Sequence, residues 1–324
     1  MKAAVYYKYG SPDVIRITEV PKPTPKDGEV LIQVKAASLN AYDWHLLRAK
    51  PFFTRALSGL FKPKNNILGA DVAGVVEEVG NGITKYKSGD EVYGCLESCG
   101  KSGLAAGGFA EYVCAKESVI AQKPTTLSFE EAAALPMAVV TAMQGVRNAG
   151  VHHGDCILIN GASGGVGAFA VQIAKSMGAK VTGVCSTESI DFVRSLGADA
   201  VIDYMKDNVV TNDTQYDVVI DVAATLSVKE YRRAMKTNGI CVIIGFSSLG
   251  HTLSYSFAGK RDGKTIKLSM TNNKNSDDLL EINELIEAGK LRVTIDSSYP
   301  LDETAEALRH VEIGHPKGKV IIVI

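Results

Sequence analysis

A glycine-rich turn between an apolar strand and a helix constrains this chain more than any other feature. Residues 156–160 have the pattern of a buried strand, the sequence GASGGVG follows at 161–167, and residues 165–177 have the pattern of a helix. Glycine at 165 lets the backbone approach a pyrophosphate, and glycine at 167 lets the helix pack closely against the strand. The amino end of the helix offers N–H groups and a partial positive charge to phosphates. The segment therefore predicts a dinucleotide-binding turn, with an unliganded turn of small residues as the alternative.

The chain beyond residue 129 alternates apolar strands with periodic helices. A helix is expected to begin at Phe129, with Ser128 as its N-cap. Strand patterns occur at 156–160, 180–185, 200–202, 218–222 and 240–245, and helix patterns at 165–177, 187–196 and 227–236. This repetition predicts an α/β fold with a parallel, doubly wound sheet of the Rossmann type, assigned to residues 125–290.

Residues 1 to about 120 are rich in short β segments. Glycines and prolines separate them, as in the connector at 21–25 and the turn into a strand at 89–92; strand patterns occur at 30–36 and 74–79. This half has the character of a β-barrel with irregular loops. An amphipathic helix at 302–312 and a strand at 319–324 close the chain and are expected to return to the first domain, which therefore comprises 1–124 and 291–324.

Composition excludes several classes of function. The 324-residue chain has a formal net charge of −1 and no run of Lys and Arg, so it does not predict a nucleic-acid partner. No apolar stretch approaches the roughly 20 residues that span a bilayer, and the N-terminus lacks a signal-peptide pattern. We therefore predict a cytoplasmic protein, or an organellar one whose transit segment has been removed, with small molecules as partners.

The six cysteines form no recognisable metal-binding pattern. They lie at 95, 99, 114, 156, 185 and 241, mostly in apolar or strand-like contexts. Only Cys95 and Cys99 are close together, and no further Cys or His follows at the spacing of a zinc knuckle. The sequence therefore predicts no bound metal.

The end of the second predicted strand bears on the choice between NAD and NADP. A carboxylate at this position binds the ribose 2′-hydroxyl of NAD and repels the 2′-phosphate of NADP. The chain has Cys185, Ser186 and Thr187 here, and the two hydroxyls favour NADPH. Lys206 and Arg194 are candidate counter-charges for the phosphate, with a solvated surface charge as the alternative for each.

The residues around the turn carry a family resemblance. Gly154-Asp155, Leu158, Gln172 and Lys175, together with the turn, form a signature similar to that of zeta-crystallin-type quinone oxidoreductases, which are zinc-lacking medium-chain dehydrogenases/reductases. Matching segments cover the whole chain, at 38–44, 69–74, 89–92, 107–112, 135–142, 194–199 and 318–320. In detail the chain resembles the branch with the chloroplast envelope quinone oxidoreductase homologue. The resemblance implies a GroES-like barrel domain packed against a Rossmann domain, with the active site in the cleft.

The zinc-ligand positions of the related alcohol dehydrogenases differ in this chain. By the resemblance, Asn40 stands where those enzymes have a zinc-binding Cys, Ala70-Asp71 replaces a His-Glu pair, and a residue near Met137 replaces a later Cys. Alanine has no donor atom and Asn is a poor zinc ligand, so the sequence predicts no catalytic zinc. Without a Lewis acid, quinones and α,β-unsaturated carbonyls fit better as acceptors than simple aldehydes do.

The resemblance also implies roles for individual residues. Asn40 and Asp43 are the expected catalytic residues: Asn40 hydrogen-bonds near the nicotinamide ribose, and Asp43 orients its loop. The expected cofactor contacts are Asn40, Thr141, Ser163, Gly164, Gly165, Val166, Ser186, Tyr204, Gly245, Phe246 and Lys319. Each has a structural alternative, such as a turn for Asn40, a helix cap for Asp43 and ordinary packing for the aromatic residues.

The segment at 42–65 is expected to be a loop that shapes the acceptor pocket. Its aromatic residues, Tyr42, Trp44, Phe52 and Phe53, are candidates to line that pocket, with a place in the core as the alternative. Tyr42 is also a candidate proton donor, although a weaker one.

Three functions are compatible with these observations. The first is an NADPH-dependent, zinc-independent quinone reductase, and the second is an enone or alkenal reductase. The third is an NADPH-binding sensor or scaffold with little turnover, because a fold does not by itself imply catalysis. An alcohol dehydrogenase is least favoured. A homodimer formed through the segments at 240–246 and 265–270 is a further expectation.

Overall fold

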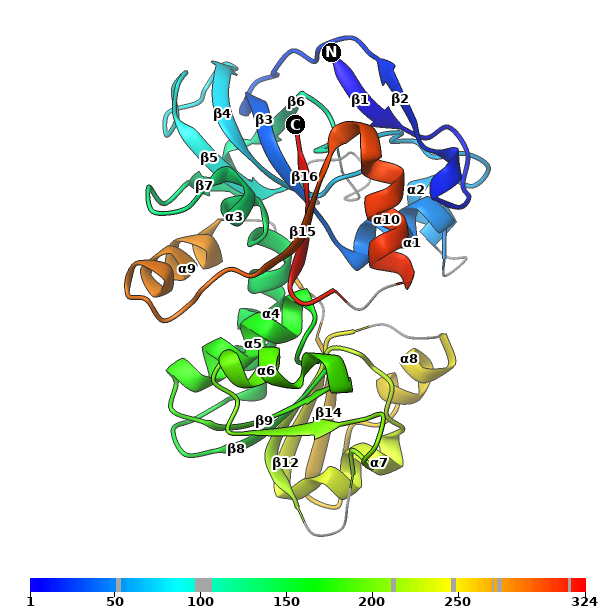
Figure 1. The fold of residues 1–324 in the computed structure, drawn as a ribbon, viewed down its shortest axis with the longest axis vertical. Coiled ribbons are helices and arrows are strands. Elements are labelled where there is room, and N and C mark those ends of the chain that lie inside the picture. The colour runs from blue at the N-terminus through cyan, green and yellow to red at the C-terminus, as the bar shows by residue number, and fades with distance from the viewer. Residues whose placement is uncertain are drawn as a thin grey trace. The chain divides into compact units, whose positions relative to one another are not determined.

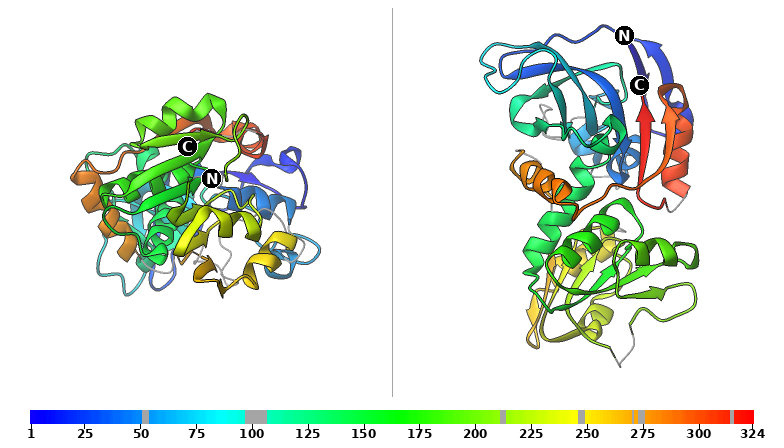
Figure 2. Two further views of the ribbon diagram at one scale, coloured as in Figure 1. Left: turned by 90° about the horizontal axis from the view of Figure 1, so that it is seen from below. Right: turned by 60° about the vertical axis from the view of Figure 1, so that its left-hand side comes forward.

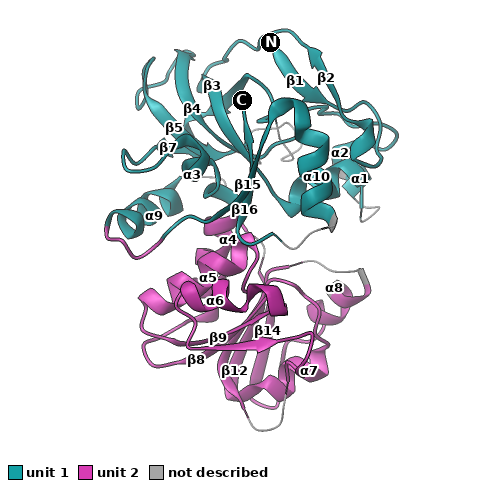
Figure 3. Cartoon of the chain, viewed as in Figure 1, with its two compact units in different colours: residues 1–137, 273–287, 292–324 teal, residues 138–272, 288–291 magenta. Residues whose placement is uncertain are grey.

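The structure is a computed structural model that describes residues 1–50, 54–96, 107–210, 214–245, 249–269, 271–272, 276–313 and 316–324. The chain forms two compact units (Figure 3). Unit 1 comprises residues 1–137, 273–287 and 292–324, and unit 2 comprises residues 138–272 and 288–291.

Unit 2 is built on one sheet. Its described strands are β8 (Cys156–Asn160), β9 (Lys180–Cys185), β10 (Ala200–Asp203), β11 (Tyr216–Asp221), β12 (Met235–Ile243), β13 (Lys260–Arg261) and β14 (Lys264–Leu268). They lie in the order β10-β9-β8-β11-β12-β14-β13, and every described pair is parallel except β13 with β14. This arrangement confirms the predicted Rossmann-type sheet.

Helices cover both faces of this sheet. They are α4 (Pro136–Ala149, whose first two residues belong to unit 1), α5 (Gly165–Ser176), α6 (Ile190–Ser195), α7 (Val228–Ala234) and α8 (Leu249–Ser256). Figure 2 shows α5 and α6 in green on one side, with α7 and α8 in yellow on the other. The helix expected at 187–196 starts as a 3-10 turn over Thr187–Ser189, because Ser189 has a non-helical ψ of 1°.

Apolar residues of the central strands form the core of unit 2. Leu158 on β8, Val219 on β11 and Cys241 on β12 are fully buried and share one cluster with Tyr231 from α7. Strands with helices on both faces need such continuous apolar runs, which is why periodicity along the chain revealed them.

Unit 1 is built on a largely antiparallel sheet. The strands β15 (Ile295–Pro300), β16 (Lys319–Val323), β3 (Glu29–Leu39), β4 (Asp71–Val79), β5 (Glu91–Cys95) and β7 (Ile120–Gln122) lie in this order, and β6 (Tyr112–Lys116) also pairs with β3. A separate pair joins β1 (Lys2–Val5) to β2 (Arg16–Glu19). In Figure 1 the red C-terminal strand β16 runs beside the blue β3, with which it is antiparallel. The C-terminal strand thus pairs with a strand from the first 124 residues.

Helices and short 3-10 turns accompany the strands of unit 1. The described α-helices are α1 (Ala41–Arg48), α2 (Thr54–Ser58), α3 (Phe129–Ala133), α9 (Asp277–Glu287) and α10 (Thr304–Ile313), and the 3-10 turns are η1 (Pro12–Val14), η3 (Glu117–Val119) and η5 (Leu301–Glu303). Ser128 caps α3 as predicted, because its side chain accepts a hydrogen bond from the Glu131 N–H at 3.2 Å.

The units divide the chain differently from the expected ranges. Residues 125–137 lie in unit 1 because α3 packs on β3 and β4. Residues 273–287 also lie in unit 1, where the Tyr93 hydroxyl donates to the side-chain oxygen of Asn283 in α9 at 2.7 Å. The division into domains of residues 1–124 with 291–324, and of residues 125–290, stays a prediction.

The expectation of a loop at 42–65 is wrong for residues 42–48 and 54–58, which are helical in α1 and α2. The helix α1 begins at Ala41 because Asn40 is extended, with φ −130° and ψ 162°, and its N–H is bound by the Asp43 carboxylate. Asp43 is the third helical residue, which is the position from which a carboxylate reaches back to the N-cap.

No helix in the described part of the chain combines the length and apolar character that a bilayer span requires.

Candidate functional site

The predicted dinucleotide turn joins β8 to α5 in unit 2. Gly161 has a φ of +82°, a backbone conformation that favours glycine, and Gly164 is the extended N-cap of α5. The Ala162 N–H donates to the Val184 carbonyl at 2.9 Å, which ties the turn to β9. A Cβ on Gly167 would lie 2.0 Å from the carbonyl oxygen of Gly161. The close approach at residue 167 is therefore to the backbone of the turn, and not to the strand as expected.

The amino end of α5 supplies the groups that bind phosphate in turns of this kind. The first intrahelical bond runs from the Ala168 N–H to the Gly164 carbonyl at 2.8 Å. The N–H groups of a first helical turn have no acceptor inside the helix, and they carry the positive end of its dipole. Gly165 and Val166 occupy that turn, and the side chain of Ser163 beside it is 9% exposed. Their contacts with the cofactor stay predictions.

A buried polar network connects the carboxyl ends of β8 and β11, next to this turn. Asn160 ends β8 and donates to the Asp221 carboxylate, at the end of β11, at 2.9 Å. The Tyr231 hydroxyl donates to the same oxygen at 2.7 Å, and the Ala224 N–H donates to the other at 2.6 Å. Burial raises the pKa of Asp221, and these donors oppose the rise. This network was not predicted, although Asn160 ends the apolar run at 156–160 and Asp221 is the one charged residue in the run at 218–222.

Gly245 lies on the same side of the sheet, just after β12. A Cβ on Gly245 would lie 1.9 Å from the Val222 carbonyl oxygen, so only glycine fits without a backbone shift. Phe246, the next predicted contact, lies outside the described residues. Thr141 is 8% exposed on α4, and its hydroxyl is 2.9 Å from that of Thr271.

The residues predicted to bind the adenosine part follow two neighbouring strands, Ser186 after β9 and Tyr204 after β10. Tyr204 is 43% exposed, so ordinary core packing does not explain it. Ser186 is half-buried, with its hydroxyl 3.4 Å from that of Ser189. Whether Ser186 and Tyr204 contact the cofactor stays a prediction.

A carboxylate that the sequence analysis overlooked also lies here. Asp203 ends β10, the parallel neighbour of β9, and accepts a hydrogen bond from the Thr187 hydroxyl at 2.5 Å. That bond is the main reason why the pKa of Asp203 is lowered. The two candidate counter-charges already contact carboxylates, Lys206 with Asp203 at 3.6 Å and Arg194 with Asp191 at 3.5 Å.

In unit 1, Asn40, Asp71 and Lys319 form a buried polar cluster. The Lys319 ammonium donates to the side-chain oxygen of Asn40 at 2.5 Å and lies 3.8 Å from the Asp71 carboxylate. The Asn40 side-chain amide donates to the same carboxylate at 2.9 Å. The three residues are 9%, 0% and 3% exposed, respectively. A buried carboxylate and ammonium of this kind are stable only together, because each compensates the charge of the other.

Three strands bring the cluster together. The register of β16 on β3 pairs Val320 with Leu39, which places Lys319 beside Asn40. The register of β3 on β4 pairs Ser38 with Asp71. Asp71 also accepts from the Ser38 hydroxyl at 3.2 Å and from the Met137 N–H at 3.0 Å. Burial raises the pKa of Asp71, and the positive charge of Lys319 opposes that rise. Burial lowers the pKa of Lys319.

Asp43 is a positioning residue in this structure. Its carboxylate is fully buried and accepts hydrogen bonds from the Asn40 N–H at 2.8 Å and the Gly69 N–H at 2.9 Å. It therefore fixes the backbone on which Asn40 is presented. The catalytic roles assigned to Asn40 and Asp43 stay predictions.

The aromatic residues near this cluster divide into two groups. Tyr42 and Trp44 pack against the apolar core of unit 1, which favours the core alternative for both. Phe52 and Phe53 lie outside the described residues.

Comparisons with known proteins identify the family. A family model for the alcohol dehydrogenase GroES-like domain matches residues 26–125, and a model described as zinc-binding dehydrogenase matches residues 196–322. The NADPH-dependent alkenal/one oxidoreductase, chloroplastic, of Arabidopsis thaliana is 34% identical over 99% of this chain and 79% of its own length. The chloroplast envelope quinone oxidoreductase homolog of the same plant is 33% identical over 99% of this chain and 98% of its own.

A solved structure extends this likeness to the fold. The quinone oxidoreductase from Coxiella burnetii superposes with a TM-score of 0.88 at 30% identity, covering 100% of this chain and 99% of its own. The chain belongs to the medium-chain dehydrogenase/reductase superfamily, in its quinone oxidoreductase-like branch. As a member of this branch it is an NAD(P)H-dependent oxidoreductase.

By the family resemblance, Asn40 and Asp71 stand at zinc-ligand positions of the related alcohol dehydrogenases. Asn40 and Asp71 are hydrogen-bonded to each other, and the buried cation beside them is the Lys319 ammonium. Within the described ranges, no three His, Cys, Asp or Glu side chains gather to hold a metal ion. Cys95 is buried in unit 1, and Cys99 lies outside the described residues.

Replacing Asp43 with asparagine is expected to change how stability depends on pH. Burial raises the pKa of Asp43 to about 7, whereas an unfolded aspartate titrates near 3.9. Between these values the folded chain binds more protons at this carboxyl than the unfolded chain does. The stability contributed by Asp43 is therefore present below about pH 4 and is lost, by up to about 4 kcal/mol, as the pH rises through 7.

The asparagine of the Asp43→Asn variant does not titrate, so urea unfolding of this variant and of the parent between pH 4 and 8 measures the effect. The stability advantage of the parent should narrow as the pH rises. A difference that stays constant or widens over this range would contradict the assignment.

Proposed function

We propose that this chain uses NADPH, without zinc, to deliver a hydride to a quinone or another electrophilic acceptor. The observation that carries the proposal is the buried Asn40–Asp71–Lys319 cluster, in which an amide, a carboxylate and an ammonium meet. By the family resemblance, Asn40 and Asp71 stand at positions of zinc ligands in the related alcohol dehydrogenases. A site that already contains a cation beside its carboxylate is a poor site for a second cation. An acceptor that needs no Lewis acid is therefore the better fit.

The cofactor supplies the hydride, and the residues of the chain bind and position it. The turn at 161–167 and the first turn of α5 suit a pyrophosphate, since glycines leave much of the backbone there uncovered and the N–H groups point out of the helix end. Asp43 holds the backbone of Asn40 in place, and Lys319 fixes the orientation of the Asn40 side chain. Reduction of a quinone consumes one hydride and one proton and gives the hydroquinone.

Two observations support NADPH over NADH. The end of β9 carries the hydroxyls of Ser186 and Thr187 rather than a carboxylate. The carboxylate of Asp203 beside it already accepts hydrogen bonds from Thr187 and the Met205 N–H and lies near the Lys206 ammonium, which reduces its repulsion of a 2′-phosphate. A relative named for NADPH dependence agrees with this preference.

Reduction of a conjugated double bond is the second candidate function. The similarity to the NADPH-dependent alkenal/one oxidoreductase of Arabidopsis supports it. Both reactions transfer a hydride to an electron-poor acceptor, so the buried cluster is compatible with either.

The deciding experiment follows NADPH absorbance with purified protein and a panel of quinones and enones. We expect oxidation of NADPH by at least one acceptor class, a kcat/KM with NADH at least tenfold lower, and no effect of a zinc chelator. Activity that is lost with the chelator and restored by zinc would overturn the zinc-free proposal. Tight NADPH binding without turnover on any acceptor would favour the sensor or scaffold.

Cytoplasmic localisation and a homodimer stay predictions. Two relatives carry chloroplast in their names, so the organellar alternative has support. The expected dimer segments are 240–246 and 265–270. The strand β14, which contains most of the second segment, pairs with β13 on the side away from β12. Residues 246–248 and 270 lie outside the described residues.

A further inference from the structure

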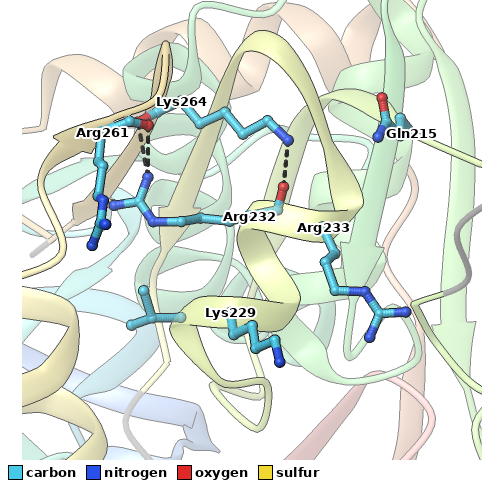
Figure 4. A pocket seen from close by; sticks show the side chains of 7 residues that line it. Gln215, Lys229, Arg232, Arg233, Arg261 and Lys264 are labelled. Carbon is cyan, nitrogen blue, oxygen red and sulfur yellow. Dashed lines mark hydrogen bonds between the residues drawn. The ribbon is translucent and has the colours of Figure 1, made fainter.

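Unit 2 contains a strongly basic cavity. Its volume is about 590 Å³, and five of its lining side chains are cationic: Lys229, Arg232, Arg233, Arg261 and Lys264 (Figure 4). Gln215 and Val228 complete the described lining, in which there is no Asp or Glu. A volume of this size lies within the range of small-molecule sites, roughly 300 to 1,000 Å³.

The cavity lies at the amino ends of the parallel strands, whereas the predicted dinucleotide turn lies at their carboxyl ends. Gln215 precedes the first residue of β11, and Lys264 is the first residue of β14. The dinucleotide turn instead follows the last residue of β8. The strands β8, β11, β12 and β14 pair in parallel, one with the next. Their amino ends therefore lie along one side of the sheet, and their carboxyl ends lie along the opposite side. The cavity is therefore separate from the cofactor turn.

Two of the cations are held in place by neutral groups. The Arg232 guanidinium donates to the carbonyls of Ala258 at 2.7 Å and Arg261 at 2.8 Å. The Lys264 ammonium donates to the Arg232 carbonyl at 2.6 Å. Carbonyl oxygens hold the guanidinium and the ammonium in place, but they carry no net charge. The positive charge of these two groups is therefore fixed in position without being cancelled.

Two carboxylates among the described residues, Asp262 and Glu230, cancel little of the charge of Arg261 and Arg233. Asp262 lies 3.6 Å from Arg261, but both side chains are 77% exposed, and an ion pair of this kind is weak in water. Glu230 on α7 accepts hydrogen bonds from the Ser227 N–H at 2.7 Å and the Ser227 hydroxyl at 2.6 Å, which caps the helix. These bonds are the main reason why the pKa of Glu230 is lowered, and the charge of Arg233 adds less.

Five like charges around one open cavity repel one another, and a multiply charged anion relieves that repulsion. We infer that this cavity binds a small, multiply charged anion of the phosphate class, such as a pyrophosphate or a phosphate ester, independently of the cofactor. Arginine presents a planar fork of donors that matches phosphate oxygens, and lysine adds a mobile point charge. The exposed side chains of Lys229 and Arg261 can turn toward such a ligand, while Arg232 and Lys264 form a fixed base.

The test is calorimetric titration of inorganic pyrophosphate into protein saturated with its oxidised cofactor, which keeps the probe out of the dinucleotide turn. The cavity variant is Lys229→Gln with Arg261→Gln, since neither side chain holds the cavity together. The matched control is Lys180→Gln with Lys290→Gln, which removes two exposed charges from the same unit outside the cavity lining. Cofactor affinity measured on each variant confirms folding.

We expect the wild-type protein to bind one pyrophosphate, the cavity variant to bind it at least tenfold more weakly, and the control to bind it within about twofold of wild type. Binding should weaken as the salt concentration rises, because the attraction is electrostatic. Absence of binding to the cofactor-saturated wild type would overturn the inference. Equal losses in the cavity variant and the control would also overturn it, since they would show an effect of net charge alone.

Discussion

Gly167→Ala is expected to weaken cofactor binding about a hundredfold and to destabilise unit 2 by about 3 kcal/mol. The new Cβ would lie 2.0 Å from the Gly161 carbonyl oxygen and 2.8 Å from the Gly161 carbonyl carbon. Backbone atoms cannot rotate away as a flexible side chain does, so the turn and α5 must separate. That separation moves the N–H groups proposed to bind the pyrophosphate. Fluorescence titration with NADPH and urea unfolding measure the two effects.

Two further glycine variants serve as controls for this prediction. Gly250→Ala in α8 adds the same methyl group in open space, where it should leave both binding and stability close to wild type. A Cβ on Gly164 would come no nearer than 3.8 Å to the Gly161 carbonyl oxygen, so Gly164→Ala should remain stable. If Gly164→Ala nevertheless binds NADPH more weakly, the turn contacts the cofactor directly. Normal binding by Gly167→Ala would refute the role of the turn.

Lys319→Met is expected to destabilise unit 1 by about 3 to 5 kcal/mol, as measured by urea unfolding. The change leaves the Asp71 carboxylate fully buried without its cation, and leaves the side-chain oxygen of Asn40 without its donor. The same substitution at Lys175, which pairs with Asp199 at 2.8 Å at the partly exposed surface, should cost about 1 kcal/mol or less.

The double variant Lys319→Met with Asp71→Asn separates charge from packing. Removing the carboxylate together with the ammonium should recover a large part of the lost stability, because no uncompensated charge remains buried. NADPH oxidation should not recover, since the orientation of Asn40 depends on Lys319. A double variant as unstable as Lys319→Met would show that the loss comes from packing and not from the charge of Asp71.

Much of unit 2 could be predicted from the sequence because its information is local. The strands β8 and β9 occur at the predicted residues, since apolar runs between helices have a recognisable length and period. The turn at 161–167 and the cap at Ser128 were also recognised from neighbouring residues alone. The helix α1 was anticipated only through the cap alternative for Asp43, because its start depends on the bond from Asn40 to Asp43 within an irregular segment that has little periodicity.

The sequence by itself determined the class of fold, the glycine-rich turn between β8 and α5 and the family, because each depends on residue types at short spacings. Only the tertiary structure decided which polar groups meet. Lys319 and Asn40 are 279 residues apart and are joined by the register of β16 on β3. Asn160 and Asp221 meet because β8 and β11 are parallel neighbours, and the basic cavity collects its charges from α7, β13 and β14. Such contacts follow from strand order and register, which depend on the packing of the whole unit and not on the spacing of residues along the chain.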